Sequence, residues 1–182
     1  WSADNQTAIE VDHDEYVITI QAGDNKVLSY YHALHDVPEG VDPIYRRSGF
    51  IHPLYSPGGK VLTRIQPQDH YHHYGMGAPW TKTHIEGKAV DFWNLKAKQG
   101  TVRFAELLST DSKPGAGGFK VRQEHVQFLP EDKERIAMNE ILDVRAIVKE
   151  VDNKRVWVID CVSTFKNMLE TPIELDQYRY GG

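Results

Sequence analysis

Apolar and polar side chains alternate along most of the chain, which is the pattern of β-strands with one buried face. Gly23-Asp24-Asn25 separates the first two alternating segments and predicts a hairpin turn. The turn at 152–154 precedes the strongest strand signal in the sequence. The segments predicted as strands on this basis are 16–20, 27–31, 101–105, 119–128 and 155–164.

Two further segments need an argument beyond simple alternation. Residues 135–149 carry apolar side chains at spacings that would also suit a helix, but their neighbours are strands and 140–148 can be read as alternating. We therefore predict a strand there. Residues 60–65 follow the turn Ser56-Pro57-Gly58-Gly59 and are predicted as a short strand. Pro and Gly mark 37–43 and 113–118 as loops.

These elements predict an all-β fold, a large antiparallel β-sandwich. No internal repeat or low-complexity tract divides the chain, so residues 1–182 are expected to form a single sandwich domain. No stretch approaches the roughly 18 apolar residues that a membrane-spanning helix needs. The formal net charge of −5, without a dense Lys/Arg block, argues against nucleic acid as a partner.

Cys161 is the only cysteine of the chain. It excludes a disulfide within the chain and a zinc site made of several thiolates. The thiol lies in the apolar segment 156–162, so we expect a small buried residue of a strand.

The most distinctive motif is Asp69-His70-Tyr71-His72-His73, within a chain that holds nine histidines. If this segment is extended, His70 and His72 project to one face and His73 to the other. Imidazoles can then hold a metal ion, act as proton donors and acceptors, or form a structural network. The residues alone leave these three alternatives open.

For a metal site the tentative ligands are His70, His72 and Asp69, and Asp69 could instead orient an imidazole ring. Zinc, manganese and iron are the divalent ions considered. A third ligand could also come from residues nearby in the sequence, for which the candidates are His52, His84 and Asp91.

Aromatic residues crowd the same region, and flat rings beside polar groups suit a sugar, whose C–H face stacks while its hydroxyls form hydrogen bonds. Trp80 lies in a loop and is expected to be exposed, whereas Phe92 and Trp93 can also be core residues. His52 is held stiffly by Pro53, and the preceding Arg46 and Arg47 could bind a carboxylate. The candidate substrate-binding residues are Arg46, Tyr55, Tyr74, Trp80, Trp93 and Arg179.

Five segments, in order along nearly the whole chain, resemble the signature of a family of secreted bacterial proteins labelled PmoA-like. They are 48–63, 69–75, 80–83, 91–94 and 178–182. This resemblance implies a periplasmic or extracellular protein of largely unknown function. The label refers to a helical membrane subunit of a methane oxygenase, and a chain without an apolar span does not fit that activity.

More distantly, residues 58–64, 72–80 and 172–180 are similar to segments of aldose 1-epimerases of the galactose-mutarotase superfamily. That resemblance implies a β-supersandwich that binds sugars. The second catalytic histidine of the epimerases would fall near Tyr178 or Arg179, where this chain has none. It also implies that the chain is the N-terminal part of the full domain, with the sheet completed by the remainder of the same protein or by a symmetry partner.

The leading hypothesis is an extracytoplasmic carbohydrate-active enzyme of the hydrolase, lyase or epimerase type. Its catalytic residues would be His70, His72 and His73, with His52 beside them, acting as general acid and base or through a divalent ion. The alternatives are a non-catalytic sugar-binding module and a structural or assembly protein that recruits another chain at an open sheet edge.

Overall fold

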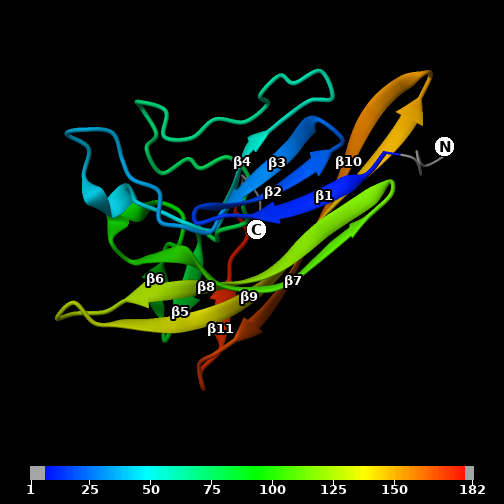
Figure 1. The fold of residues 1–182 in the computed structure, drawn as a ribbon. Helices are drawn as coiled ribbons and strands as arrows, with labels where there is room; N and C mark the ends of the chain where they lie inside the picture. The colour runs from blue at the N-terminus through cyan, green and yellow to red at the C-terminus, as the bar shows by residue number, and fades with distance from the viewer. Residues whose placement is uncertain (1–6, 179–182) are drawn as a thin grey trace.

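The computed structural model describes residues 7–178 and confirms an all-β chain built from antiparallel sheets (Figure 1). Only two short 3-10 helices, η1 (Pro43–Tyr45) and η2 (Leu95–Ala97), interrupt the strands of the described range. No helix in residues 7–178 has the length and apolarity to cross a membrane. The strands are β1 (Ile9–His13), β2 (Val17–Ala22), β3 (Asn25–Tyr31), β4 (Phe50–Leu54), β5 (Thr83–Ile85), β6 (Lys88–Val90), β7 (Gly100–Lys113), β8 (Ala116–Phe128), β9 (Glu134–Val151), β10 (Lys154–Asn167) and β11 (Ile173–Leu175).

The strands form three sheets. One has the order β1-β2-β3-β4, the long one has the order β10-β9-β8-β7, and the small one has the order β11-β5-β6. Neighbours in the first two sheets follow one another in the sequence. Short turns join them, except between β3 and β4, where residues 32–49 with η1 form a longer connection. The small sheet differs, because β11 pairs with β5 from far earlier in the chain.

One half of the long sheet is covered by the sheet β1–β4, and the other half is covered by the small sheet (Figure 1). Phe119, Val121 and Val144 pack with residues of β1–β4 such as Ile20 and Leu28. A second apolar cluster joins the other half of the long sheet to the small sheet, through Val102, Ala137, Met138, Ile85, Val90 and Phe92. The sandwich therefore has two cores. Loops that connect the strands around these cores carry the residues of the candidate site.

The alternation in β9 explains why this segment is a strand rather than a helix. Leu142, Val144, Ala146 and Val148 are buried and point to one face, which a period of two satisfies and a helical period does not. The turn between β9 and β10 has positive φ at both Asp152 and Asn153, as a two-residue type I′ hairpin requires. The strand predictions for 140–148 and 155–164 are thus confirmed and extended.

Two predictions of local structure were wrong. Residues 60–65 form no strand, because only Val61 and Ile65 make isolated bridges to Tyr55 and Tyr74. The predicted loop 113–118 is a tight turn at Pro114-Gly115, since β7 reaches Lys113 and β8 begins at Ala116. Sequence signals marked the turn residues there but not the length of the strands.

Cys161 is exposed rather than buried. It lies on β10, which is the edge strand of the long sheet, and neighbours such as Asp160 and Val162 are also exposed. No other sheet covers this part of β10 within residues 7–178. An apolar run therefore produced a strand here without producing a buried one.

Candidate functional site

The histidine motif lies in a compact loop between β4 and β5 and is not extended. Two tight turns fold it: the His70 N–H donates to the Pro67 carbonyl, and the His73 N–H donates to the His70 carbonyl at 2.9 Å. The alternating projection expected for an extended segment was therefore wrong. The turns bring all three imidazoles together instead, and we call His70, His72 and His73 the histidine cluster.

Each ring of the histidine cluster contacts the other two. The centroid separations are 5.7 Å for His70–His72, 4.8 Å for His70–His73 and 4.5 Å for His72–His73. Trp93 borders the cluster with its indole 5.8 Å from His73 and 6.4 Å from His72, in edge-to-face geometry. Three proton-transfer groups and one large aromatic ring thus share a small region.

Electrostatics favour neutral imidazoles at two positions of the cluster. Partial burial lowers the pKa of His72, and the neighbouring His73 and His70 lower it further. Partial burial likewise lowers the pKa of His73, with His70 adding to the effect. A neutral imidazole can accept a proton or bind a metal, which a protonated one cannot.

Asp69 and His70 form the exposed end of the cluster. The Asp69 carboxylate lies 3.0 Å from His70 Nδ1, and hydrogen bonds to the backbone and to His70 lower the pKa of Asp69. The charged carboxylate holds the His70 ring through one nitrogen, which orients its Nε2 outward from the pair. The predicted orienting role of Asp69 therefore matches the geometry.

The loop is anchored to β4 directly after the histidines. Met76 exchanges both backbone hydrogen bonds with Ile51, and the Gly75 N–H donates to the Arg64 carbonyl. The Tyr74 hydroxyl donates to the Tyr45 carbonyl at 2.6 Å and accepts from Gln66. Burial raises the pKa of Tyr74 to about 12. Tyr74 therefore supports the loop from the interior.

His52 lies on β4 beside this anchor, and the peptide bond before Pro53 is cis. Its Nδ1 is 2.9 Å from the Thr63 hydroxyl, which also accepts from the Leu54 N–H. Partial burial lowers the pKa of His52, with a smaller contribution from His35. The structure describes no ring contact between His52 and the histidine cluster.

Arg47 is a buried arginine that borders the same region. Its burial lowers the pKa to about 10, so the guanidinium remains charged at neutral pH. Its charge also contributes to the lowered pKa of His72. Sequence reasoning considered Arg47 only together with its neighbour Arg46, because nothing in the sequence distinguishes a buried arginine from an exposed one.

The remaining predicted substrate-binding residues are dispersed. Arg46 is exposed and pairs with Asp36 at 2.7 Å, and Tyr55 bridges to Val61. Trp80, expected to be exposed, is half-buried against the second core and packs edge-on to Phe165. Arg179 lies outside the described residues. Of this set, Trp93 alone has a ring contact with the histidine cluster within residues 7–178.

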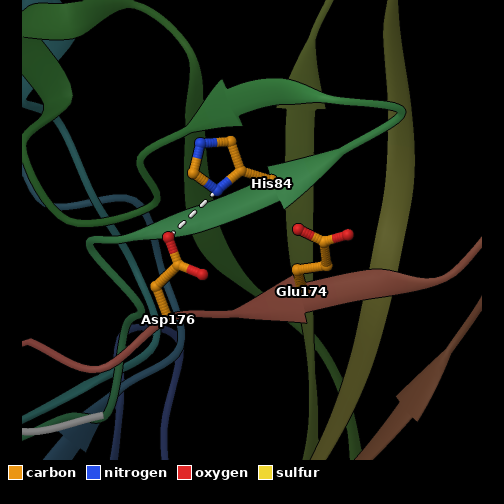
Figure 2. A group of neighbouring side chains, drawn as sticks. All are labelled: His84, Glu174 and Asp176. Carbon is orange, nitrogen blue, oxygen red and sulfur yellow. Dashed lines mark ion pairs between the residues drawn. The ribbon is translucent and has the colours of Figure 1, made fainter.

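A second group of polar side chains lies on the small sheet. His84 on β5, Glu174 on β11 and Asp176 directly after β11 point toward one another (Figure 2). One ligand atom of each lies within 4.8 Å of the others, and His84 Nδ1 is 3.1 Å from Asp176 Oδ2. His84 was considered as a ligand, but its partners were missed, although the alternation of 173–176 places both acids on one face.

The other metal ligands predicted from the sequence can be compared with this group. Within residues 7–178 the potential ligand atoms converge at His84, Glu174 and Asp176. Asp91, by contrast, accepts hydrogen bonds from the backbone of Trp93 and Asn94 and holds that turn. The set His70, His72 and Asp69 stays a prediction.

A third polar group is buried inside the sandwich. Glu140 accepts from His125 Nε2 at 3.0 Å, from Gln123 at 3.1 Å and from the Ser163 hydroxyl at 2.5 Å. The Tyr30 hydroxyl donates to Gln123 and extends the chain of hydrogen bonds. The sequence does not indicate this contact, because only the pairing of β8 with β9 brings His125 to Glu140.

No curated protein sequence and no solved structure is significantly similar to the chain. One family model, described as a family of unknown function (DUF6807), matches residues 17–182. The match includes every strand from β2 onward and each of the three polar groups described above. The chain therefore belongs to the DUF6807 family.

Proposed function

We propose that the protein is an extracytoplasmic carbohydrate-active enzyme in which the histidine cluster transfers protons to and from a sugar. The observation that carries this proposal is the contact of three imidazoles with one another and with Trp93. The sequence resemblance to secreted PmoA-like proteins, and more distantly to galactose-mutarotase-like enzymes, agrees with it.

The acid–base role follows from the electrostatics of the cluster. A general base must be unprotonated near neutral pH, and the lowered pKa values of His72 and His73 meet that condition. His70 differs, because its Nδ1 faces the Asp69 carboxylate. We assign His72 or His73 as the base and His70 as the proton donor, acting at a sugar carbon or at a glycosidic oxygen.

The carbohydrate class follows from the aromatic neighbours. Trp93 lies beside the two neutral imidazoles, and Tyr71 of the histidine loop forms a ring pair with Tyr45 of η1, with the ring centroids 5.9 Å apart. Aromatic faces stack on the C–H face of a sugar, while imidazoles exchange hydrogen bonds with its hydroxyls. A metal-assisted version of the reaction would use the same histidines as ligands for zinc, manganese or iron.

The test is an activity screen with matched variants. Wild type, His72→Ala, His73→Ala and Trp93→Ala are incubated with aryl glycosides, and with reducing sugars in D2O to detect proton exchange by NMR. His13→Ala on β1 serves as the control, because it removes an exposed imidazole from a strand outside the site loops. We expect the histidine variants to lose about 100-fold or more in rate.

The outcomes separate the alternatives. If wild type shows no turnover and sugar binding survives in His72→Ala and His73→Ala, the protein is a sugar-binding module and not an enzyme. If the wild-type protein neither turns over nor binds any of the sugars tested, the proposal is overturned. Metal analysis before and after chelation, on wild type and on His70→Ala/His72→Ala, decides between the metal-free and the metal-assisted version.

A further inference from the structure

We propose that His84, Glu174 and Asp176 form a binding site for a divalent transition-metal ion, with zinc as the preferred ion. The site lies on the small sheet and uses none of the residues of the histidine cluster. It is independent of the proposed sugar chemistry. One cross-strand pair and one residue after the strand supply the three ligands (Figure 2).

Strand register places the ligands on one face. Glu174 is the direct partner of His84 in the antiparallel pair of β11 with β5. The Asp176 N–H donates to the Lys82 carbonyl at 2.9 Å, which continues the ladder by one more step. Because side chains alternate along a strand, Glu174 and Asp176 project to the same side, and His84 faces them from the neighbouring strand.

The opposite face of the same strands fixes their positions. Thr83 and Ile85 flank His84 and are buried, and the Thr83 hydroxyl donates to the Val90 carbonyl. Ile173 packs against the second core next to Glu174. The ligand-bearing backbone is therefore held by an apolar layer, which supplies the preorganised support that a metal site needs.

The separations suit coordination. In a tetrahedral zinc site with bonds of about 2.1 Å, two ligand atoms lie about 3.4 Å apart. His84 Nδ1 and Asp176 Oδ2 are 3.1 Å apart, and the Glu174 carboxylate lies within 4.8 Å of both. A rotation of the exposed Glu174 side chain closes the remaining distance. Three protein ligands then leave a fourth position for water.

Ligand chemistry selects the ion. One imidazole with two carboxylates favours zinc and related transition metals, whereas calcium and magnesium prefer oxygen ligands alone. Apart from His84, one cation forms an ion pair with these carboxylates within residues 7–178, and it neutralises only part of their negative charge. That cation is Lys82, whose Nζ is 3.7 Å from Asp176 Oδ2, and a bound metal would displace it.

The experiment measures zinc affinity of the chelator-treated protein by competition with a chromophoric chelator. We expect one zinc ion per chain. Glu174→Gln and His84→Ala should each weaken binding by more than about tenfold, since loss of even an outer-shell partner costs that much. Lys82→Met should tighten binding, because it removes the competing cation. Glu10→Gln on β1 is the control for loss of an exposed carboxylate.

Thermal unfolding of each variant without metal separates misfolding from loss of a ligand. Zinc should raise the midpoint of wild type and of Glu10→Gln, and not that of Glu174→Gln. Zinc affinity that is unchanged in His84→Ala and Glu174→Gln overturns the proposal. So does binding that depends on His70 and His72 instead. Sugar turnover that persists in Glu174→Gln is expected, because the two sites are separate.

Discussion

His125 Nε2 lies 3.0 Å from Glu140 Oε2, and both side chains are almost completely shielded from solvent, with exposed fractions of 0% and 1%. The Glu140 carboxylate also accepts from Gln123 and Ser163, so three donors from β8 and β10 converge on one acceptor of β9. A buried carboxylate is tolerated when its oxygens are satisfied in this way. The network therefore specifies which faces of β8, β9 and β10 point to the interior.

Removal of Glu140 should destabilise the fold strongly. Glu140→Ala leaves the buried donors of His125 and Gln123 and the half-buried Ser163 hydroxyl without an acceptor. We therefore expect a loss of about 3–5 kcal/mol in the free energy of unfolding. Glu140→Gln keeps the volume and one acceptor and should cost less. Urea denaturation measures both, and a loss below about 1 kcal/mol for Glu140→Ala would contradict a structural role.

Stability should fall as the pH drops below the ordinary histidine pKa. The pKa values of His35, His52, His72 and His73 are lowered by burial, so the unfolded chain takes up protons first. The free energy of unfolding is therefore unaffected by these histidines above pH about 6.5, and it decreases as the pH falls below that value. Urea midpoints at pH 8 and pH 5.5 test this sign.

A second pH range provides the control. Asp14, Asp69 and Glu86 have lowered pKa values, and their contribution is lost only as the pH falls below about 4.5. The double variant His72→Gln/His73→Gln should flatten the change between pH 8 and 5.5 and leave the acid range as it is. An equal slope in this variant would show that the cluster does not titrate as described.

Loss of His70 should raise the pKa of its two neighbours. A protonated His70 repels a second proton on His72 and on His73, and its contribution ranks just after burial for His73. His70→Ala should therefore move both pKa values upward, and that of His73 more than that of His72. NMR titration of the imidazole signals measures these shifts. Unchanged values would mean that the rings are farther apart in solution.

Gly75 should tolerate no side chain. Its φ is +46°, and an added Cβ would collide with the Ile51 carbonyl oxygen. Gly75→Ala should cost well over 2 kcal/mol, in excess of the roughly 1–2 kcal/mol for a left-handed alanine. Gly59→Ala in the same loop region is the matched control, since its φ is +79° and its Cβ would meet nothing. Equal losses for both variants would contradict the close contact.

The thiol of Cys161 should react, but slowly at neutral pH. The residue is exposed as a whole. Partial burial of its sulfur and the negative charge of Asp160 nevertheless raise the pKa of the thiol. Alkylation by iodoacetamide in the native state should proceed without denaturant and accelerate as the pH rises. Asp160→Asn should increase the rate at pH 8. A native thiol that reacts only in urea would contradict its exposure on β10.

The long strands could be predicted because their signals are local. Turn residues such as Asp152-Asn153 and the alternation in β8 and β9 depend on neighbours in the sequence alone. Residues 60–65 show the limit: their apolar pattern resembles a strand, but within residues 7–178 they form only isolated bridges, of Val61 with Tyr55 and of Ile65 with Tyr74. Cys161 shows a second limit, because burial depends on what covers a strand and not on its composition.

The candidate site could be predicted only in part. The sequence identified the histidine cluster by its composition, but two turns at His70 and His73, and not a strand, bring the rings together. Glu174 and Asp176 were missed because their partner His84 lies far away in the chain and meets them only through strand pairing. His125 and Glu140 were missed for the same reason, since β8–β9 register creates their contact.

The pairing of β11 with β5 has a consequence for the order of folding. The hairpins of the long sheet close short loops, whereas β11 must find β5 across about half of the chain, and such distant contacts form slowly. Only three residues of each strand take part, so little is gained until the second core is already in place. We therefore expect His84 and Glu174 to come together late in folding, so that their contact marks a chain that has completed its native topology.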